Sequence, residues 1–309
     1  MQIDMKNEKS KGEFKRQEDA FRDWVTSDGS TEYGAEKDRY HLYVSLACPW
    51  AHRTLIVRQL MGLNDVVGAT VVDPVRDEKG WRFGTGDGFA EDPINGFRFL
   101  QEAYRTSDPG WRGRVTVPVL WDKKTNRIVN NSEDDICLMF HQGFGSFSNG
   151  KWDLFPQDMV DEQTELSALI YETVNNGVYR AGFAGAQGVH ERAVRGVFET
   201  LDMLENRLAD RRYLLGDMIT EADWRLFCSL IRFDAVYYVH FKCNMRRIVD
   251  YHHLWGYLRD LYQVDGIAET VNFDHIKRHY YITHPDINPT RFVPVGPVDL
   301  DFDAPHGRE

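Results

Sequence analysis

The chain has 309 residues, of which 42% are hydrophobic and 28% are charged, which is an ordinary composition for a globular protein. This length is large for one hydrophobic core and comfortable for two domains. A formal net charge of −11 weighs against nucleic acid or an anionic membrane surface as a partner. The N-terminal residues are charged and no apolar run reaches membrane-spanning length, so we expect neither a signal peptide nor a membrane-spanning helix.

The cysteines are far apart in the sequence, and no two of them form a CxxC pair or a zinc-type spacing. They are Cys48, Cys137, Cys228 and Cys243. This pattern argues against a disulfide framework and favours the cytoplasm as the location. The histidines are scattered as well, so we expect no metal site.

The first part of the chain alternates between strand and helix patterns. Residues 1–39 are predicted to form an extended or loosely ordered N-terminal arm. Residues 42–46 form a short apolar run of strand-forming residues, and the apolar residues of 53–61 recur at helical spacing. A second β-branched run, residues 65–72, would lie parallel to the first strand, which completes a β-α-β unit.

The next segment contains a proline that fits poorly in a sheet. Residues 73–113 show no clear periodicity, and an excursion of this length inside a compact domain is more often functional than neutral. Residues 114–121 are predicted as a third strand, although Pro118 cannot donate a ladder hydrogen bond. A return strand at 127–129 then leads into a helix that opens with Asn, Ser and acidic residues, which are good capping residues.

The second part of the chain is predicted to be helical. A Gly/Ser-rich stretch indicates a linker, which we place at residues 146–158, and the chain from 284 to 309 is rich in Pro, Gly and Asp and is predicted as an irregular tail. Between them, helical spacing of apolar residues extends over 159–179, 187–207, 220–238 and 253–263, with a short helix at 274–281.

Cys48 occupies a chemically distinctive position, directly after the first strand and directly before a helix. Pro49 suits the first helical position, because its missing N–H would be unpaired there anyway. The Cys48 sulfur would therefore lie beside free N–H donors at the positive end of a helix dipole, which favours the nucleophilic thiolate. An isolated cysteine is more often a buried structural residue, but this placement favours a nucleophile.

Six separated motifs, in chain order, resemble those of one family. They are CPWAHR at 48–53, GWRF at 80–83, RVTVPVLWDKKTNRIVNN at 114–131, NNGVYRAGFA at 175–184, HFKCN at 240–244 and NFDHIKRHYY at 272–281. Over nearly its whole length the chain resembles the glutathione transferases, and among them the Xi class, or glutathionyl-hydroquinone reductases. The resemblance implies an α/β plus all-α fold, with a thioredoxin-like glutathione-binding domain at 40–145 and an all-helical domain at 159–283.

The resemblance implies roles for several residues of the first domain. Cys48 would be the catalytic nucleophile, and Trp81 would line the glutathione site. Pro118 would be the cis-proline of thioredoxin-like folds, with the backbone of Val117 pairing the cysteinyl part of glutathione.

One pair of residues departs from the family pattern. The family usually has Glu-Ser where this chain has Ser132-Glu133, at the position that binds the γ-glutamyl end of glutathione. A hydroxyl and a carboxylate at a helix start still suit a zwitterionic amino-acid head. The reversed order leaves open a different γ-glutamyl thiol or weaker glutathione binding.

In the helical domain the resemblance implies that Tyr179 and Tyr280 are catalytic and face an aromatic substrate. Since Tyr280 and Tyr281 are adjacent, we expect one to point inward and the other outward. His52 and Arg53 follow Cys48 within about one helical turn, and we expect both to be solvated. The remaining three cysteines are expected to be packing residues.

The activity implied by the resemblance is a two-step thiol exchange. The Cys48 thiolate attacks the sulfur of a glutathionyl-hydroquinone, and a second glutathione then cleaves the Cys48–glutathione mixed disulfide. Glutathione is thus a co-substrate, aromatic hydroquinone conjugates are the substrates, no cofactor is permanently bound, and a homodimer is expected.

Three other functions remain open. The chain could be an omega-like thioltransferase or dehydroascorbate reductase, or a non-catalytic binding module on a transferase scaffold. A conventional transferase that conjugates glutathione to electrophiles fits less well, because conjugation needs glutathione itself as the thiolate rather than a protein cysteine.

Overall fold

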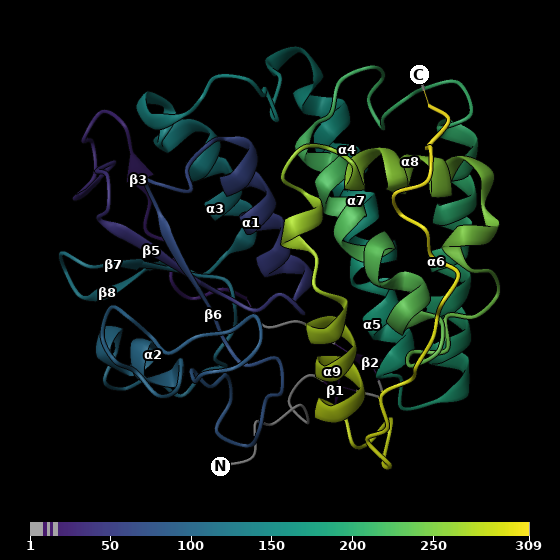
Figure 1. Cartoon of the computed structure of the whole chain (residues 1–309), viewed down its shortest axis with the longest axis horizontal. Coiled ribbons are helices and arrows are strands. Elements are labelled where there is room, and N and C mark those ends of the chain that lie inside the picture. Colours follow the sequence, from purple (N-terminus) through teal and green to yellow (C-terminus); the bar gives the residue numbers. More distant parts are fainter. Residues whose placement is uncertain (1–8, 11–12, 15–17, 309) are drawn as a thin grey trace. The chain divides into compact units, whose positions relative to one another are not determined.

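The computed structural model describes residues 9–10, 13–14 and 18–308 (Figure 1). The remainder of the predicted N-terminal arm lies outside these described residues. The described chain divides into two compact units. Unit 1 comprises residues 18–153 and 270–279, and unit 2 comprises 154–269 and 280–308 together with the described residues before 17.

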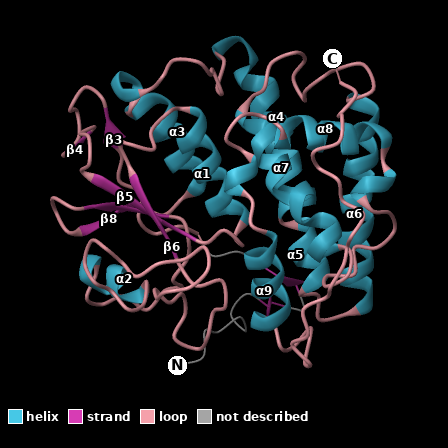
Figure 2. Cartoon of the chain, viewed as in Figure 1, coloured by secondary structure: helices cyan, strands magenta, loops and turns pink. Residues whose placement is uncertain are grey.

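Unit 1 is built on a four-stranded mixed sheet (Figure 2). Its strands and helices are β5 (Tyr40–Val44), α1 (Pro49–Leu60), β6 (Gly68–Val71), α2 (Gln101–Ser107), β7 (Val119–Asp122), β8 (Arg127–Asn130) and α3 (Glu133–Leu138). The strand order is β6-β5-β7-β8, with β5 parallel to β6 and antiparallel to β7, and β8 antiparallel to β7. The predicted β-α-β and β-β-α order is therefore confirmed. In Figure 1 helices α1 and α3 lie together on one side of the sheet, and α2 lies on the other.

The third strand is shorter than predicted. It begins only at Val119, directly after a cis Val117–Pro118 bond. Since proline has no N–H to donate to a ladder, residues 114–118 do not extend the strand.

The described part of the N-terminal arm is not loose. Two short strands, β3 (Val25–Thr26) and β4 (Tyr33–Gly34), pair in parallel. The amide of Asp23 donates to the Val129 carbonyl at 3.0 Å, and the amide of Asn131 donates to the Phe21 carbonyl at 3.1 Å. These bonds tie residues 21–23 to the outer edge of β8, so the expectation of a loose arm is wrong for this part.

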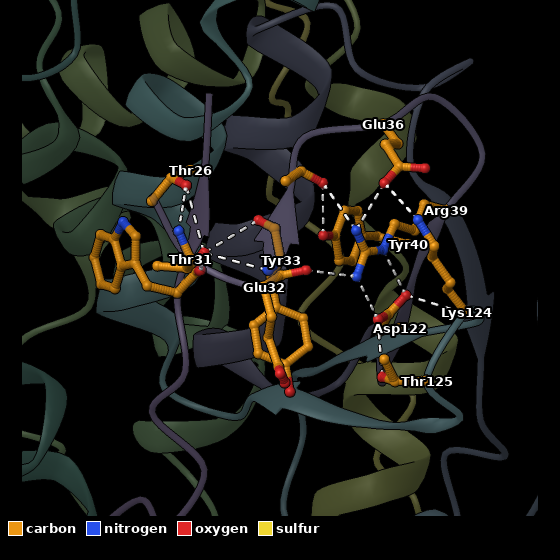
Figure 3. Close-up of polar contacts among 12 residues, drawn as sticks. Thr26, Thr31, Glu32, Tyr33, Glu36, Arg39, Tyr40, Asp122, Lys124 and Thr125 are labelled. Atoms are coloured by element: carbon orange, nitrogen blue, oxygen red, sulfur yellow. Dashed lines mark hydrogen bonds and ion pairs between the residues drawn. The ribbon is translucent and has the colours of Figure 1, made fainter. Parts of the chain in front are cut away.

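A buried ion pair joins the end of the arm to the sheet (Figure 3). The Arg39 guanidinium donates from Nε and Nη2 to the two carboxylate oxygens of Asp122, at 2.9 and 2.8 Å, and from Nη1 to Glu36 at 2.8 Å. Asp122 also accepts from the Thr125 hydroxyl at 2.8 Å and from the Lys124 amide at 3.0 Å. The two-point geometry and the extra donors satisfy this buried carboxylate.

Replacing Asp122 by alanine leaves the Arg39 guanidinium buried without its main partner. We expect Asp122→Ala to lower the free energy of unfolding of unit 1 by about 3 kcal/mol or more, the cost of breaking a buried pair. Urea unfolding, followed by circular dichroism, measures this loss. The matched control is Lys124→Gln, because Lys124 pairs with Glu36 at an exposed position and its loss should cost under about 1 kcal/mol.

The same pair makes a prediction about pH. Burial alone raises the pKa of Asp122, but the hydrogen bonds from Arg39, Lys124 and Thr125 outweigh burial and lower the pKa below its usual value. The stabilisation is therefore complete above the pKa of an unfolded aspartate, about 3.9, and is lost as the pH falls through the lower folded value. The stability difference between the native chain and Asp122→Ala should shrink below about pH 4, and a constant difference would contradict this account.

Unit 2 is mainly helical. Its helices are α4 (Val160–Ile170), α5 (Gly177–Gly182), α6 (Gln187–Arg207), α7 (Glu221–Arg232) and α8 (His252–Tyr262). Helix α9 (Phe273–Thr283) begins in unit 1 and ends in unit 2. The predicted helix 187–207 matches α6, whereas 159–179 and 220–238 each contain a π-helical turn, at Tyr171–Asn175 and Phe233–Tyr237. In the described chain, no helix combines the length and the apolar character needed to cross a bilayer.

The division into units differs from the predicted domain limits at one place, residues 270–279. The chain changes unit between Asp153 and Leu154, inside the segment predicted as a linker. Residues 270–279 group with unit 1, although helical spacing places them with the other helices. The spacing of apolar residues indicates that a helix has an apolar face, but it does not indicate which unit that face contacts.

Candidate functional site

Cys48 lies between β5 and α1, immediately before the first helical residue, Pro49. Its backbone is extended, with φ −79° and ψ 120°, and its amide donates to the Ser45 carbonyl at 3.1 Å. Its sulfur lies 3.7 Å from the carbonyl oxygen of Val117. The side chain is partly exposed. The structure thus places a partly exposed cysteine at a helix N-terminus, where a thiolate is favoured.

The other cysteines differ sharply from Cys48. All four are free thiols, but Cys137, Cys228 and Cys243 are buried. Burial raises the pKa of the Cys243 thiol to about 12, so it stays protonated at neutral pH. Their burial agrees with the packing role expected from the sequence.

The residues predicted to hold the cysteinyl part of glutathione lie beside Cys48. Val117 precedes the cis bond to Pro118 and lies outside the paired positions of β5 and β7. Its backbone is therefore not part of the sheet ladder, and its carbonyl faces the sulfur.

Ser132 and Glu133 form the start of α3. Ser132 is the N-cap residue; its amide donates to the Asn130 side-chain oxygen at 2.7 Å, and its carbonyl accepts from the Ile136 amide at 3.0 Å. The Glu133 carboxylate is buried and lies 3.4 Å from the guanidinium of Arg53 in α1. The first turn of α3 also carries Asp134, so this helix start is acidic.

Arg53 and His52 are both buried, and the expectation that they are solvated is wrong. The side chain of Arg53 extends from α1 to the start of α3, where it also pairs with Asp134 at 2.5 Å. The His52 ring contacts the Thr270 hydroxyl at 2.7 Å. Both partners are far away in the sequence, which is why helix periodicity alone does not reveal them.

Trp81 is buried, with 4% of its surface exposed. Its ring stacks on that of His279 at 5.1 Å and 19°, and the Arg76 guanidinium lies 5.3 Å from its centre. His279 Nδ1 in turn donates to the Pro74 carbonyl at 2.7 Å. Trp81 is therefore part of a packed cluster with the loop that precedes it and with the first part of α9.

In unit 2 three tyrosine hydroxyls meet. The hydroxyls of Tyr179, in α5, and Tyr280, in α9, are hydrogen-bonded to each other. The Tyr237 hydroxyl lies 3.2 Å from that of Tyr280. Burial, more than the neighbouring phenol, raises the pKa of Tyr237 well above its usual value, so Tyr237 remains a neutral donor.

Tyr237 was not predicted, because it ends a buried helical stretch in which an aromatic residue is ordinary core. Tyr281 corrects another expectation. It is buried, like Tyr280, and its hydroxyl donates to the Ala235 carbonyl at 3.1 Å. Both neighbours therefore point into packed surroundings. Within residues 18–308, no three His, Cys, Asp or Glu side chains converge as a metal-ligand set.

Comparison with known proteins shows the family of this chain. The model of the glutathione S-transferase N-terminal domain matches residues 47–142, and that of the C-terminal domain matches 187–260. The chain is 51% identical, over 96% of its length and 93% of the relative, to glutathionyl-hydroquinone reductase YqjG of Escherichia coli strain K12. It is 44% identical, over 94% and 91%, to glutathionyl-hydroquinone reductase PcpF of Sphingobium chlorophenolicum.

A solved Xi class transferase from Natrialba magadii has a TM-score of 0.91 to this chain, at 50% identity over 93% of this chain and 88% of that one. This chain belongs to the Xi class of glutathione transferases. The glutathione-bound structure of YqjG has a TM-score of 0.90, at 51% identity over 94% and 96%. In the present chain, the region that matches the N-terminal domain model begins one residue before Cys48. It includes all the residues predicted to bind glutathione.

The burial of three of the four cysteines predicts selective alkylation of this transferase. Iodoacetamide should label Cys48 alone in the folded protein, because the thiolate must be accessible to react. Peptide mass mapping, with a sample unfolded in guanidinium as the control for full labelling, measures the site. Equal labelling of Cys137 or Cys228 in the folded protein would contradict the described burial.

Proposed function

We propose that this transferase reduces glutathionyl-hydroquinones to hydroquinones through a Cys48–glutathione mixed disulfide. The observation that carries the proposal is the position of Cys48: its partly exposed sulfur lies at the start of α1 and beside the carbonyl that precedes the cis-proline. Two relatives that match nearly the full length of the chain bear the name of this activity.

In the first step, the Cys48 thiolate attacks the sulfur of the glutathionyl-hydroquinone. A sulfur–sulfur bond forms and the bond between sulfur and the ring carbon breaks. The electron pair of that bond stays with the ring, which gains one proton and leaves as the hydroquinone. A keto tautomer of the ring eases this step, because the electron pair is then delocalised onto the carbonyl oxygen.

In the second step, the thiolate of another glutathione attacks the mixed disulfide. Glutathione disulfide leaves and the Cys48 thiolate is restored. The two glutathione sulfurs supply the two electrons that reduce the ring, so the scheme calls for no resident cofactor. It needs no resolving cysteine either, which fits the burial of the other three thiols.

For the amino-acid head of glutathione we propose the start of α3. The Ser132 hydroxyl would face its carboxylate, and Glu133 would face its ammonium group. The Arg53 guanidinium lies 3.4 Å from the Glu133 carboxylate and attracts it toward α1. Val117, Pro118 and Trp81 are the further glutathione-binding residues of the proposal.

For the aromatic ring we propose the phenol groups of Tyr179 and Tyr280. Their mutual hydrogen bond supports the proposal, because a phenol that is already polarised by a second phenol is a better donor to a developing oxyanion. We also propose that the protein is a cytoplasmic homodimer; its free cysteines fit a reducing compartment.

Cys48→Ser tests the first step. A serine hydroxyl is not ionised at neutral pH and cannot form the mixed disulfide, so turnover should fall by about a thousandfold or more. Release of hydroquinone from a synthetic glutathionyl-hydroquinone measures it, with Cys228→Ala as the control for a buried cysteine. Undiminished turnover in Cys48→Ser would overturn the scheme.

Tyr280→Phe tests the role of the phenols and separates the alternative functions. The variant should lose about 10- to 100-fold in kcat with a glutathionyl-hydroquinone and keep its activity on a small mixed disulfide, which needs no ring proton transfer. Tyr281→Phe is the matched control, since the neighbouring hydroxyl bonds only a backbone carbonyl. If the native protein prefers the small disulfide, the omega-like thioltransferase function is correct instead.

A further inference from the structure

A cavity of about 450 Å³ lies in unit 2, apart from the residues of the proposed reaction. It is bounded by the start of α8, by the 3₁₀ turn before it (Ile248–Asp250) and by the C-terminal segment. The side chains that matter for its chemistry are Asp250, His252, His253, Trp255, Arg259 and His306. Its volume lies within the range of small-molecule sites.

The cavity wall is held in place by specific contacts of the C-terminal segment. A Cβ atom on Gly256 would lie 2.8 Å from the His306 carbonyl oxygen, so the segment can approach α8 this closely only at a glycine. The Arg308 guanidinium donates to the carbonyls of Leu208 at 3.1 Å and Arg212 at 2.9 Å. The side-chain amide of Gln263 donates from Nε2 to the backbone carbonyl of Phe302 at 2.8 Å. The wall is therefore preformed.

Arg259 is the unusual residue of this cavity. Its guanidinium lies 5.2 Å from the centre of the Trp255 ring, one helical turn earlier on α8. Its Nε atom is buried and has no hydrogen-bond partner among the described residues, and no described carboxylate pairs with it. A guanidinium that no described carboxylate neutralises is suited to bind an anion.

Three histidines line the same cavity as Arg259. The rings of His252 and His253 lie 4.7 Å apart at the start of α8, and their backbone amides donate to the Glu205 carboxylate at 2.9 and 2.8 Å. These two amides at the start of α8 are therefore already hydrogen-bonded, and an anion in the cavity would have to bind side chains. His306 accepts from the Arg308 amide through Nδ1 at 3.0 Å, so its Nε2 carries the proton when the ring is neutral.

The acidic groups near the cavity already have hydrogen-bond or ion-pair partners, and the partners of Glu205 are the backbone amides at the start of α8. Asp250 is the acid among the lining residues, and the Arg247 guanidinium lies 3.1 Å from it. Asp260 lies 3.8 Å from His306 Nε2 but accepts from the Arg212 Nε at 2.9 Å. Among the lining residues, two arginines, Arg259 and Arg308, stand against one carboxylate, Asp250.

We propose that this cavity binds a small multivalent oxyanion, a phosphate or polycarboxylate group, with Arg259 as its main contact and His252, His253 and His306 around it. The guanidinium provides two N–H donors in the plane that matches either oxyanion. None of the residues proposed for thiol exchange lines this cavity, so the proposal stands independently of the reaction.

Calorimetric titration of the full chain tests the proposal. The probes are pyrophosphate and citrate, with chloride at equal ionic strength as the reference. We expect saturable binding of at least one probe, and about tenfold weaker binding in Arg259→Gln, as for the loss of a charged hydrogen bond. Preference between the two probes identifies the oxyanion class.

Arg246→Gln is the matched control, since Arg246 also stacks on an aromatic ring, that of Tyr251 at 4.5 Å, but pairs with Asp202 and does not line the cavity. It should bind the probe as the native chain does. Should Arg259→Gln fail to fold, His252→Asn with His253→Asn removes the other cavity donors, and the probe should shift the native histidine Cε1–H resonances. Binding no tighter than chloride, or equal loss in Arg246→Gln, would overturn the proposal.

Discussion

The reactive end of unit 1 depends on the antiparallel pairing of β5 with β7. Tyr43 is paired with Val119 in this register. The residues that follow β5 and the residues that precede β7 therefore lie at the same end of these two strands. Cys48 and Val117 lie just beyond those paired residues, and the sulfur faces the carbonyl at 3.7 Å. A shift of one residue would turn the side chains to the opposite face and separate these two groups.

Helix α1 adds the second requirement. It begins at Pro49, so the sulfur lies at its positive end. Four residues on, the helix presents Arg53 to the start of α3, where the guanidinium meets Glu133 and Asp134. One helix thus connects the nucleophile with the acidic group proposed for the amino-acid head of glutathione.

Local patterns in the sequence predicted the elements that have local causes. Periodicity and strand propensity predicted the strand before Cys48 and helix 187–207. They also predicted the order of strands and helices along the chain of unit 1. The start of α7 has a local cause too, a capping box in which the Thr220 amide donates to Asp223 at 2.8 Å. The burial of His52 and Arg53, the third tyrosine hydroxyl and the grouping of residues 270–279 with unit 1 depend on contacts distant in sequence, which no local pattern reports. The family resemblance, rather than periodicity, pointed to Tyr179 and Tyr280.

The most direct test of the account is whether Cys48 bonds covalently to glutathione. Native protein is incubated with oxidised glutathione and then digested without reductant, and the peptides are mapped by mass spectrometry. The account predicts one glutathione per chain, on the peptide that contains Cys48, and its removal by added glutathione. An unmodified Cys48 under conditions that modify a small reference thiol would contradict it.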